Sequence, residues 1–156
     1  MGTLATHLVD LQNGGVKTVS DLMAGHAQYT AAAALPRLTP VFIDAFADIQ
    51  AAQANVIATA ECVGLLLGDS QLNQSVTVVR NGPIEGSVAE WTAVAGGTLL
   101  AGEEYVVDPR NSGRLITMPE LMALHPVAGW SRSRVGRAVS STTLFVSPTA
   151  PEFFDV

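Results

Sequence analysis

The sequence predicts a mainly β protein: a small β-barrel or sandwich with an internal pseudo-repeat, preceded by a short helical or extended N-terminal arm. Apolar runs of strand length alternate with turns marked by glycine, proline and asparagine through most of the 156 residues. A succession of strand, glycine-marked strand and strand near the middle of the chain is echoed near its end, whereas the first 38 residues lack it. We therefore divide the chain into an arm (1–38), a β-barrel domain (39–147) and a C-terminal tail (148–156).

The arm favours two short helices. Leu4, Leu8 and Leu11 recur at helical spacing. Ser20 is suited to cap a second helix that reaches Ala27. Short, weakly amphipathic helices do not fold alone. Such helices must dock on the barrel or on a neighbouring subunit, or else stay mobile, and we expect the arm either to contact a neighbouring subunit or to cover its own barrel.

The first pass of the pseudo-repeat begins with a short strand at residues 41–43. Residues 45–55 are rich in alanine and glutamine and are expected to form a loop or one helical turn. Residues 56–67 are long and apolar and are expected to form a buried strand with a bulge at Gly64. Residues 75–80 alternate in the manner of a third strand.

The second pass follows a turn predicted at residues 81–83, where asparagine, glycine and proline are consecutive. A helical turn is expected at residues 119–124, with proline at its first position. The strands expected in this half are residues 84–91, 105–107, 114–118, 133–139 and 142–146.

The composition favours a protein that assembles. Only 14% of the residues are charged, against ~25% in a typical soluble domain, and Lys17 is the one lysine. The surface is either coated with small polar residues or buried against other subunits, where charged residues are depleted, and we favour the second interpretation. A net charge of −6 argues against a nucleic-acid partner. No apolar run approaches the ~18 residues that a membrane span needs, so no membrane partner is expected.

Nothing in the sequence predicts catalysis, a metal site or a cofactor. The three histidines, His7, His26 and His125, lie in separate segments without a second ligand at metal spacing. Asp44 and Asp108 follow strands at corresponding places in the two passes. Such aspartates are expected to cap the following turns rather than to act as acid and base. We expect a protein that is not an enzyme.

Several residues are candidates for an interface instead. Five of the seven arginines gather in the second pass, and they form either a patch for acidic groups on a partner or a solvated edge that discourages stray strand pairing. Two tryptophans could stack on a sugar, but packing in the core or at a subunit interface is favoured. Two phenylalanines in the tail predict docking, in cis or in trans. These candidates are Arg110, Arg114, Arg132, Arg134, Arg137, Trp91, Trp130, Phe153 and Phe154, together with the three arm leucines.

One stretch of the second pass carries a family resemblance. Its pieces are Trp91-Thr92-Ala93-Val94, Leu100-Ala101-Gly102-Glu103-Glu104-Tyr105, Asp108-Pro109, Gly113-Arg114-Leu115-Ile116-Thr117 and Val135-Gly136-Arg137-Ala138-Val139-Ser140-Ser141-Thr142-Thr143-Leu144-Phe145-Val146. This stretch resembles the capsid decoration (cement) proteins of tailed bacteriophages, which are small β-barrel head proteins, and also the β modules of phage fibres.

The resemblance implies a non-enzymatic structural protein of the virion. It would assemble, often as a homotrimer, on the outer surface of the capsid and span joints between subunits of the major capsid protein. The alternative implied by the resemblance is a tail-fibre or baseplate module that binds host surface glycans through Trp91 or Trp130. Neither function requires a cofactor.

Overall fold

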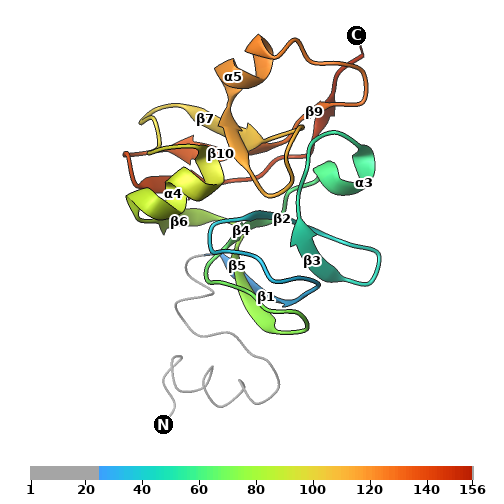
Figure 1. The fold of residues 1–156 in the computed structure, drawn as a ribbon, viewed down its shortest axis with the longest axis vertical. Coiled ribbons are helices and arrows are strands. Elements are labelled where there is room, and N and C mark those ends of the chain that lie inside the picture. Colours follow the sequence, from blue (N-terminus) through green and yellow to red (C-terminus); the bar gives the residue numbers. More distant parts are fainter. Residues whose placement is uncertain (1–24, 156) are drawn as a thin grey trace.

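The computed structural model describes residues 25–155, which form a closed five-stranded barrel joined to an open five-stranded sheet (Figure 1). The mainly β fold class predicted from the sequence is confirmed. Leu4, Leu8, Leu11 and Ser20, on which the expected arm helices depend, lie outside the described residues.

The barrel is built from the first half of the described chain. β1 closes it by pairing in parallel with β3 and antiparallel with β5. Its interior is filled by a cluster of buried apolar side chains, among them Val41, Ile49, Leu66 and Val78. The strands are β1 (His26–Ala31), β2 (Pro40–Ile43), β3 (Asp48–Ala51), β4 (Gly64–Leu66) and β5 (Ser75–Val79).

The second half forms the open sheet, in the order β6-β11-β10-β7-β8, and a separate pair of two-residue strands, β9 and β12. Its strands are β6 (Gly82–Glu85), β7 (Glu104–Val107), β8 (Leu115–Thr117), β9 (Ser131–Arg132), β10 (Arg134–Ala138), β11 (Thr143–Val146) and β12 (Glu152–Phe153). The helices are α3 (Ile57–Ala60), α4 (Val88–Ala95) and α5 (Met118–Ala123).

The echo in the sequence corresponds to a repeat in topology. The barrel order β3-β2-β4-β5-β1 has its counterpart in the sheet order β8-β7-β10-β11-β6, and α3 and α5 each follow the second strand of a hairpin. The registers agree as well: Val41 lies opposite Gly64, as Tyr105 lies opposite Gly136. The halves differ in closure, because among the described strands β1 pairs with β3 but β6 does not pair with β8.

Each half has a glycine in its middle strand, Gly64 in β4 and Gly136 in β10, and the close packing of neighbouring backbones explains why glycine occurs at both places. A Cβ atom on Gly64 would overlap the carbonyl oxygen of Val79, and one on Gly136 would overlap that of Phe145. Only a residue without a side chain lets the two backbones approach so closely. The glycines that mark the echoed strands are therefore required by the pairing of β4 with β5 and of β10 with β11.

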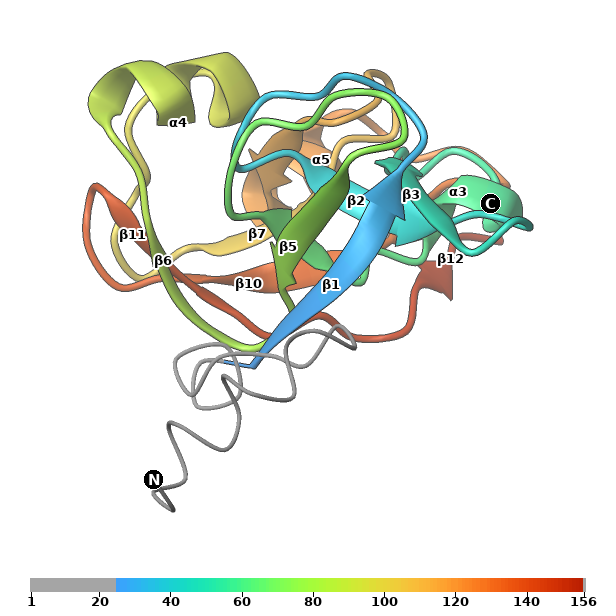
Figure 2. The same cartoon turned by 90° about the horizontal axis from the view of Figure 1, so that it is seen from below.

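Helix α4 covers the inner face of the open sheet, and Figure 2 shows it on one side of β6, β11 and β10. Its start is fixed by a capping box in which Ser87 and Glu90 each accept a hydrogen bond from the other's backbone N–H. The completely buried Trp91 points inward, and its Nε1 donates to the carbonyl of Thr142 at 2.7 Å. One core cluster joins this helix, the sheet and the outer face of the barrel, so the two halves form one packed body.

The boundary drawn at residue 38 is wrong. β1 occupies His26–Ala31, so the barrel begins inside the segment assigned to the arm, and the helix expected to reach Ala27 is a strand there. The reason is non-local: β1 pairs with β5 over five residues, from His26 opposite Val79 to Thr30 opposite Ser75. Such pairing overrides a weak local preference for helix.

Four other local predictions also differ from the structure. Residues 45–55 contain β3, and residues 56–67 contain α3 followed by the short β4 rather than one long strand. Of residues 84–91, expected to be one strand, only the first two belong to β6, and the last four lie in α4. The capping box at the start of α4 outweighs the strand-like pattern there. The turn expected at residues 81–83 is the start of β6, where proline is tolerated because β6 is an edge strand.

The remaining predicted elements are confirmed. The strands expected at residues 41–43, 75–80, 105–107, 114–118, 133–139 and 142–146 correspond to β2, β5, β7, β8, β10 and β11. The helical turn expected at residues 119–124 corresponds to α5, with proline in its first turn and a capping box formed by Thr117 and Glu120.

Replacing either repeat glycine by alanine should destabilise the protein severely. The new Cβ would force the backbones of neighbouring strands apart, and we expect Gly64→Ala and Gly136→Ala each to lower the free energy of unfolding by about 3 kcal/mol or more. Gly97→Ala is the matched control, because a Cβ at Gly97 meets no atom within 4 Å. Urea unfolding of the three variants measures the difference. A Gly136→Ala variant as stable as the control would contradict the close approach.

Candidate interaction surfaces

The two aspartates that follow corresponding strands both hold turns. Oδ1 of Asp44 accepts hydrogen bonds from the backbone N–H groups of Phe46 (2.9 Å) and Asp48 (3.0 Å), and its Oδ2 accepts one from the side-chain amide of Gln50 (2.7 Å). The buried Asp108 accepts from the backbone N–H of Arg110 at 2.8 Å. The turn-capping interpretation is confirmed for both, and neither carboxylate contacts a histidine in the described hydrogen bonds and ion pairs.

The described residues contain no cluster of metal ligands, and the one cysteine of the chain is buried. Within residues 25–155 no group of three or more His, Cys, Asp or Glu side chains could hold a metal ion. Cys62 is buried, and loss of solvation raises the pKa of its thiol from 9.0 to about 12, so the thiol stays protonated at neutral pH. In the described part of the chain, no helix has the length and apolar character to cross a bilayer.

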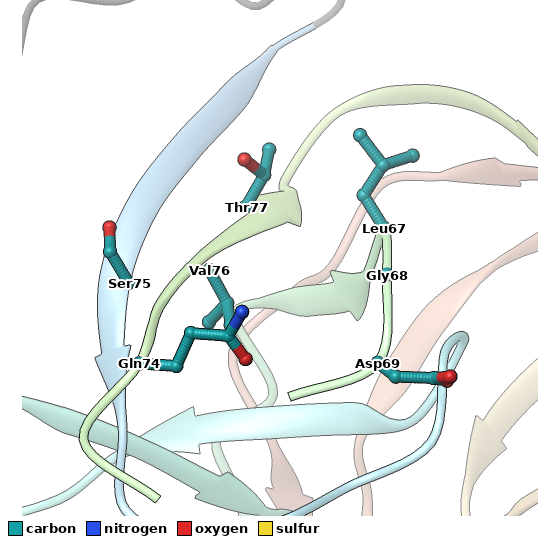
Figure 3. A pocket seen from close by; sticks show the side chains of 7 residues that line it. All are labelled: Leu67, Gly68, Asp69, Gln74, Ser75, Val76 and Thr77. Atoms are coloured by element: carbon teal, nitrogen blue, oxygen red, sulfur yellow. The ribbon is translucent and has the colours of Figure 1, made fainter. Parts of the chain in front are cut away.

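The hollow of mixed polarity drawn in Figure 3 lies between strand β5 and the segment that precedes it, and it measures about 260 Å³. Its polar groups serve the loop. Oδ1 of Asp69 accepts from the backbone N–H of Arg37 at 2.8 Å, and Oε1 of Gln74 accepts from that of Gln71 at 2.9 Å. The first contact joins the β4–β5 connection to the β1–β2 connection, and the second lies within the β4–β5 connection, so both polar groups have a structural role.

Within the predicted arginine cluster, Arg134 and Arg137 share an acidic partner of their own chain. Nε of Arg134 lies 3.1 Å from Oε1 of Glu104, and its Nη2 lies 3.6 Å from Oε1 of Glu152. Arg137 lies 3.9 Å from Oε2 of Glu104 and donates to the carbonyl of Gly102. Two glutamates therefore balance two arginines, which leaves little net positive charge here for an acidic partner.

The other three arginines have contacts of their own. Arg110 lies 3.3 Å from the carboxylate of Asp108. The guanidinium of Arg132 stacks over the ring of Phe154, 5.0 Å from its centroid. Arg114 is half-buried, and its backbone carbonyl accepts from the N–H of Asp108.

The tryptophans are both packed into the chain. Trp91 is completely buried in the main core, so its side chain cannot contact a partner or a glycan, and its place among the interface candidates is corrected. Trp130 is half-buried against a small cluster formed by Val106, Ile116 and Leu121. Of the two, Trp130 alone keeps exposed surface.

The tail docks in cis. Strand β12 pairs with β9, and the backbone N–H of Phe154 donates to the carbonyl of Trp130 at 2.8 Å. Phe154 packs against the same small cluster as Trp130, while Phe153 remains exposed.

A stripe of exposed apolar side chains crosses this side of the molecule. Val56, Ile57 and Phe153, with Asn55 and Gly129, line a shallow apolar hollow of about 300 Å³. A second hollow adjoins it at Ile57 and includes Ile43, Glu61 and Arg80. We use the name apolar hollow for the first and apolar stripe for the exposed side chains Ile43, Val56, Ile57 and Phe153.

Phe46 stands at the tip of the β2–β3 hairpin, whose first strand carries Ile43 of the stripe, and is the most exposed large hydrophobic residue in the described chain, at 86%. Of the residues of the stripe and its neighbourhood, the sequence singled out only Phe153. The available signal for Phe46 was its place two residues after a turn-capping aspartate, where a side chain has no strand neighbour to pack on.

Comparison of the chain with protein-family models gives no match, and comparison with curated proteins gives no significant match. The function is therefore inferred from the fold, the surface and the resemblance noted in the sequence.

The pKa of Asp44 should rise when Gln50 is replaced by alanine. In the wild type this pKa lies below its ordinary value of 3.8, first because of the hydrogen bond from Gln50 and further because of those from the backbone of Asp48 and Phe46. The ionised carboxylate therefore stabilises the fold above pH 3.8, and this contribution is lost as the pH falls through the lowered pKa. NMR titration of the Asp44 carboxyl in the wild type and in Gln50→Ala measures the change.

The control for this titration is Gln53→Ala. The amide of Gln53 donates to the carbonyl of Pro109, away from Asp44, so the pKa of Asp44 should stay at its wild-type value. Identical titrations in Gln50→Ala and Gln53→Ala would show that the Gln50 contact does not hold the carboxylate.

Proposed function

We propose that this protein is a non-enzymatic capsid decoration protein of a tailed bacteriophage, which self-associates and binds the outer surface of the head across joints between major capsid protein subunits. The observation that carries the proposal is the exposure of large apolar side chains on a chain with few charges. Twelve such side chains are exposed in residues 25–155, and they include Phe46, Ile57, Val139 and Phe145. The family resemblance supplies the identity of the partner.

Buried area is what such a protein contributes. A standard interface buries about 800 Å² on each partner, and apolar burial is worth about 25 cal/mol per Å². A contact of this kind repeated at every joint adds up to a large stabilisation of the shell against internal pressure. The chain suits this task because its hollows are shallow, and in the hollow of Figure 3 the side chains of Asp69 and Gln74 are bonded to the chain's own loops.

The proposal also assigns contacts outside the barrel and an oligomeric state. The arm leucines, Leu4, Leu8 and Leu11, and the exposed Phe153 would supply contacts outside the barrel, and the assembly would be a homotrimer, as the resemblance implies.

The alternative of a fibre or baseplate module that binds glycans is weakened, because Trp91 is buried and only Trp130 is left to stack on a sugar.

Purified full-length protein should bind expanded, undecorated phage heads saturably. The number of bound copies should match the number of capsid joints, because each joint offers the same apolar site, and the bound heads should resist heating better. Sedimentation with quantitative gel analysis measures the copy number, and heads that already carry a full decoration layer are the control. Absence of saturable binding would defeat the assignment, and binding of a few copies at one vertex would favour a tail component.

A further inference from the structure

Two exposed apolar features stand out in the described chain: the side chain of Phe46, in the turn between β2 and β3, and the apolar hollow, which Val56 and Ile57 line at the start of α3. We propose that the apolar hollow receives Phe46 from a second copy of this chain. The inference rests on the self-association in the proposed function and assigns it to a particular surface. Figure 1 places α3 beside β3 and β9, and Figure 2 places α3 beside β3 and β12, so the elements that carry the two features are neighbours.

The turn that displays Phe46 is rigid. Asp44 accepts three hydrogen bonds across it, one of them from the backbone N–H of Phe46 itself. Ala47 adopts a left-handed conformation with φ 64°, and its N–H donates to the carbonyl of Asp44 at 3.0 Å. A side chain held on such a turn loses little conformational freedom when it binds, which is the property of an interface anchor.

The corresponding turn of the second half is anchored to the barrel at its end, although its residues 110–112 are exposed. In the second half, the connection between β7 and β8 also begins with an aspartate, Asp108, and its Gly113 packs on the barrel: the N–H of Gly113 donates to the carbonyl of Ala52 at 2.8 Å. The corresponding turn of the first half carries Phe46 and stays exposed.

Size and charge favour a second copy as that molecule. A cavity of ~150 Å³ accommodates a benzene ring, so a hollow of about 300 Å³ has room for the ring of a phenylalanine. The adjoining hollow carries one charge of each sign, Glu61 and Arg80, beside Ile43 and Ile57. A copy brings the same pair, so opposite charges can face each other across the contact and offset the repulsion between two chains of net charge −6.

The proposed contact is one that symmetry can repeat. A two-fold rotation would join two copies with both hollows filled, and a three-fold rotation would form a ring of three. Either assembly buries Phe46 together with the apolar stripe. Clustered, desolvated aromatic residues of this kind carry most of the binding energy of an interface.

The test measures the association of full-length protein by analytical ultracentrifugation. Phe46→Ala, which removes the inserted ring, and Ile57→Glu, which places a charge in the hollow, should each weaken association by about thirtyfold or more. Leu72→Ala is the matched control, because Leu72 is 64% exposed but lies outside both hollows. Circular dichroism and thermal melting confirm that each variant is folded.

Mixing the two defective variants tests the pairing itself. The Phe46→Ala chain keeps an intact hollow and the Ile57→Glu chain keeps an intact Phe46, so a mixture should form mixed pairs while each variant alone does not. Failure of the mixture to associate would overturn the proposal, as would a monomeric wild type or association unchanged by either substitution.

Head binding separates this inference from the proposed function. A wild-type protein that is monomeric in solution but binds heads, and loses that binding in both variants, would assign the apolar stripe to the capsid protein and overturn the inference while leaving the function intact. Association that requires Phe46, in a protein that does not bind heads, would overturn the proposed function alone.

Discussion

A backbone contact made twice determines the architecture of this protein. In each half, a glycine in a middle strand lies directly against the backbone of the neighbouring strand, Gly64 at Val79 and Gly136 at Phe145. The approach leaves no room for a side chain and so fixes which residues pair. The neighbouring registers follow from it, because Gly64 and Gly136 also lie opposite Val41 and Tyr105 in the hairpins on their other side. The same strand order then results in both halves.

What distinguishes the halves is how each one covers its concave face. The barrel closes on itself through the parallel pairing of β1 with β3 and fills its interior with its own side chains. The sheet stays open, and its inner face is covered by α4 and by the outside of the barrel. As a result β4 and β5 are buried on both faces: Leu66 and Val78 point into the barrel, while Leu65 and Val79 belong to the shared core. Continuous rather than alternating apolar runs are the expected sequence of such strands.

The sequence predicted those features that recur or that depend on neighbouring residues. The pseudo-repeat was recognisable because glycine and aspartate occupy corresponding places, and both capping aspartates were identified correctly. Helix α4 was missed although its start is visible in the sequence, as Ser87 followed three residues later by Glu90. β1 could not be predicted locally, because its stability comes from partners about fifty residues away in β5. The exposure of Phe46 likewise depends on what the rest of the fold leaves uncovered.

Several polar side chains of the described chain serve the fold itself. Asp44, Asp69 and Asp108 hold turns and loops, and Glu104 and Glu152 balance Arg134 and Arg137. The surface that we assign to contact with another molecule, the apolar stripe and Phe46, is apolar. Binding through such a surface depends on buried area and shape, which dissolved salt does not screen as it screens exposed charges. Selectivity must then come from fit, and an aromatic side chain on a hydrogen-bonded turn, together with an apolar hollow large enough for its ring, supplies fit without requiring charge.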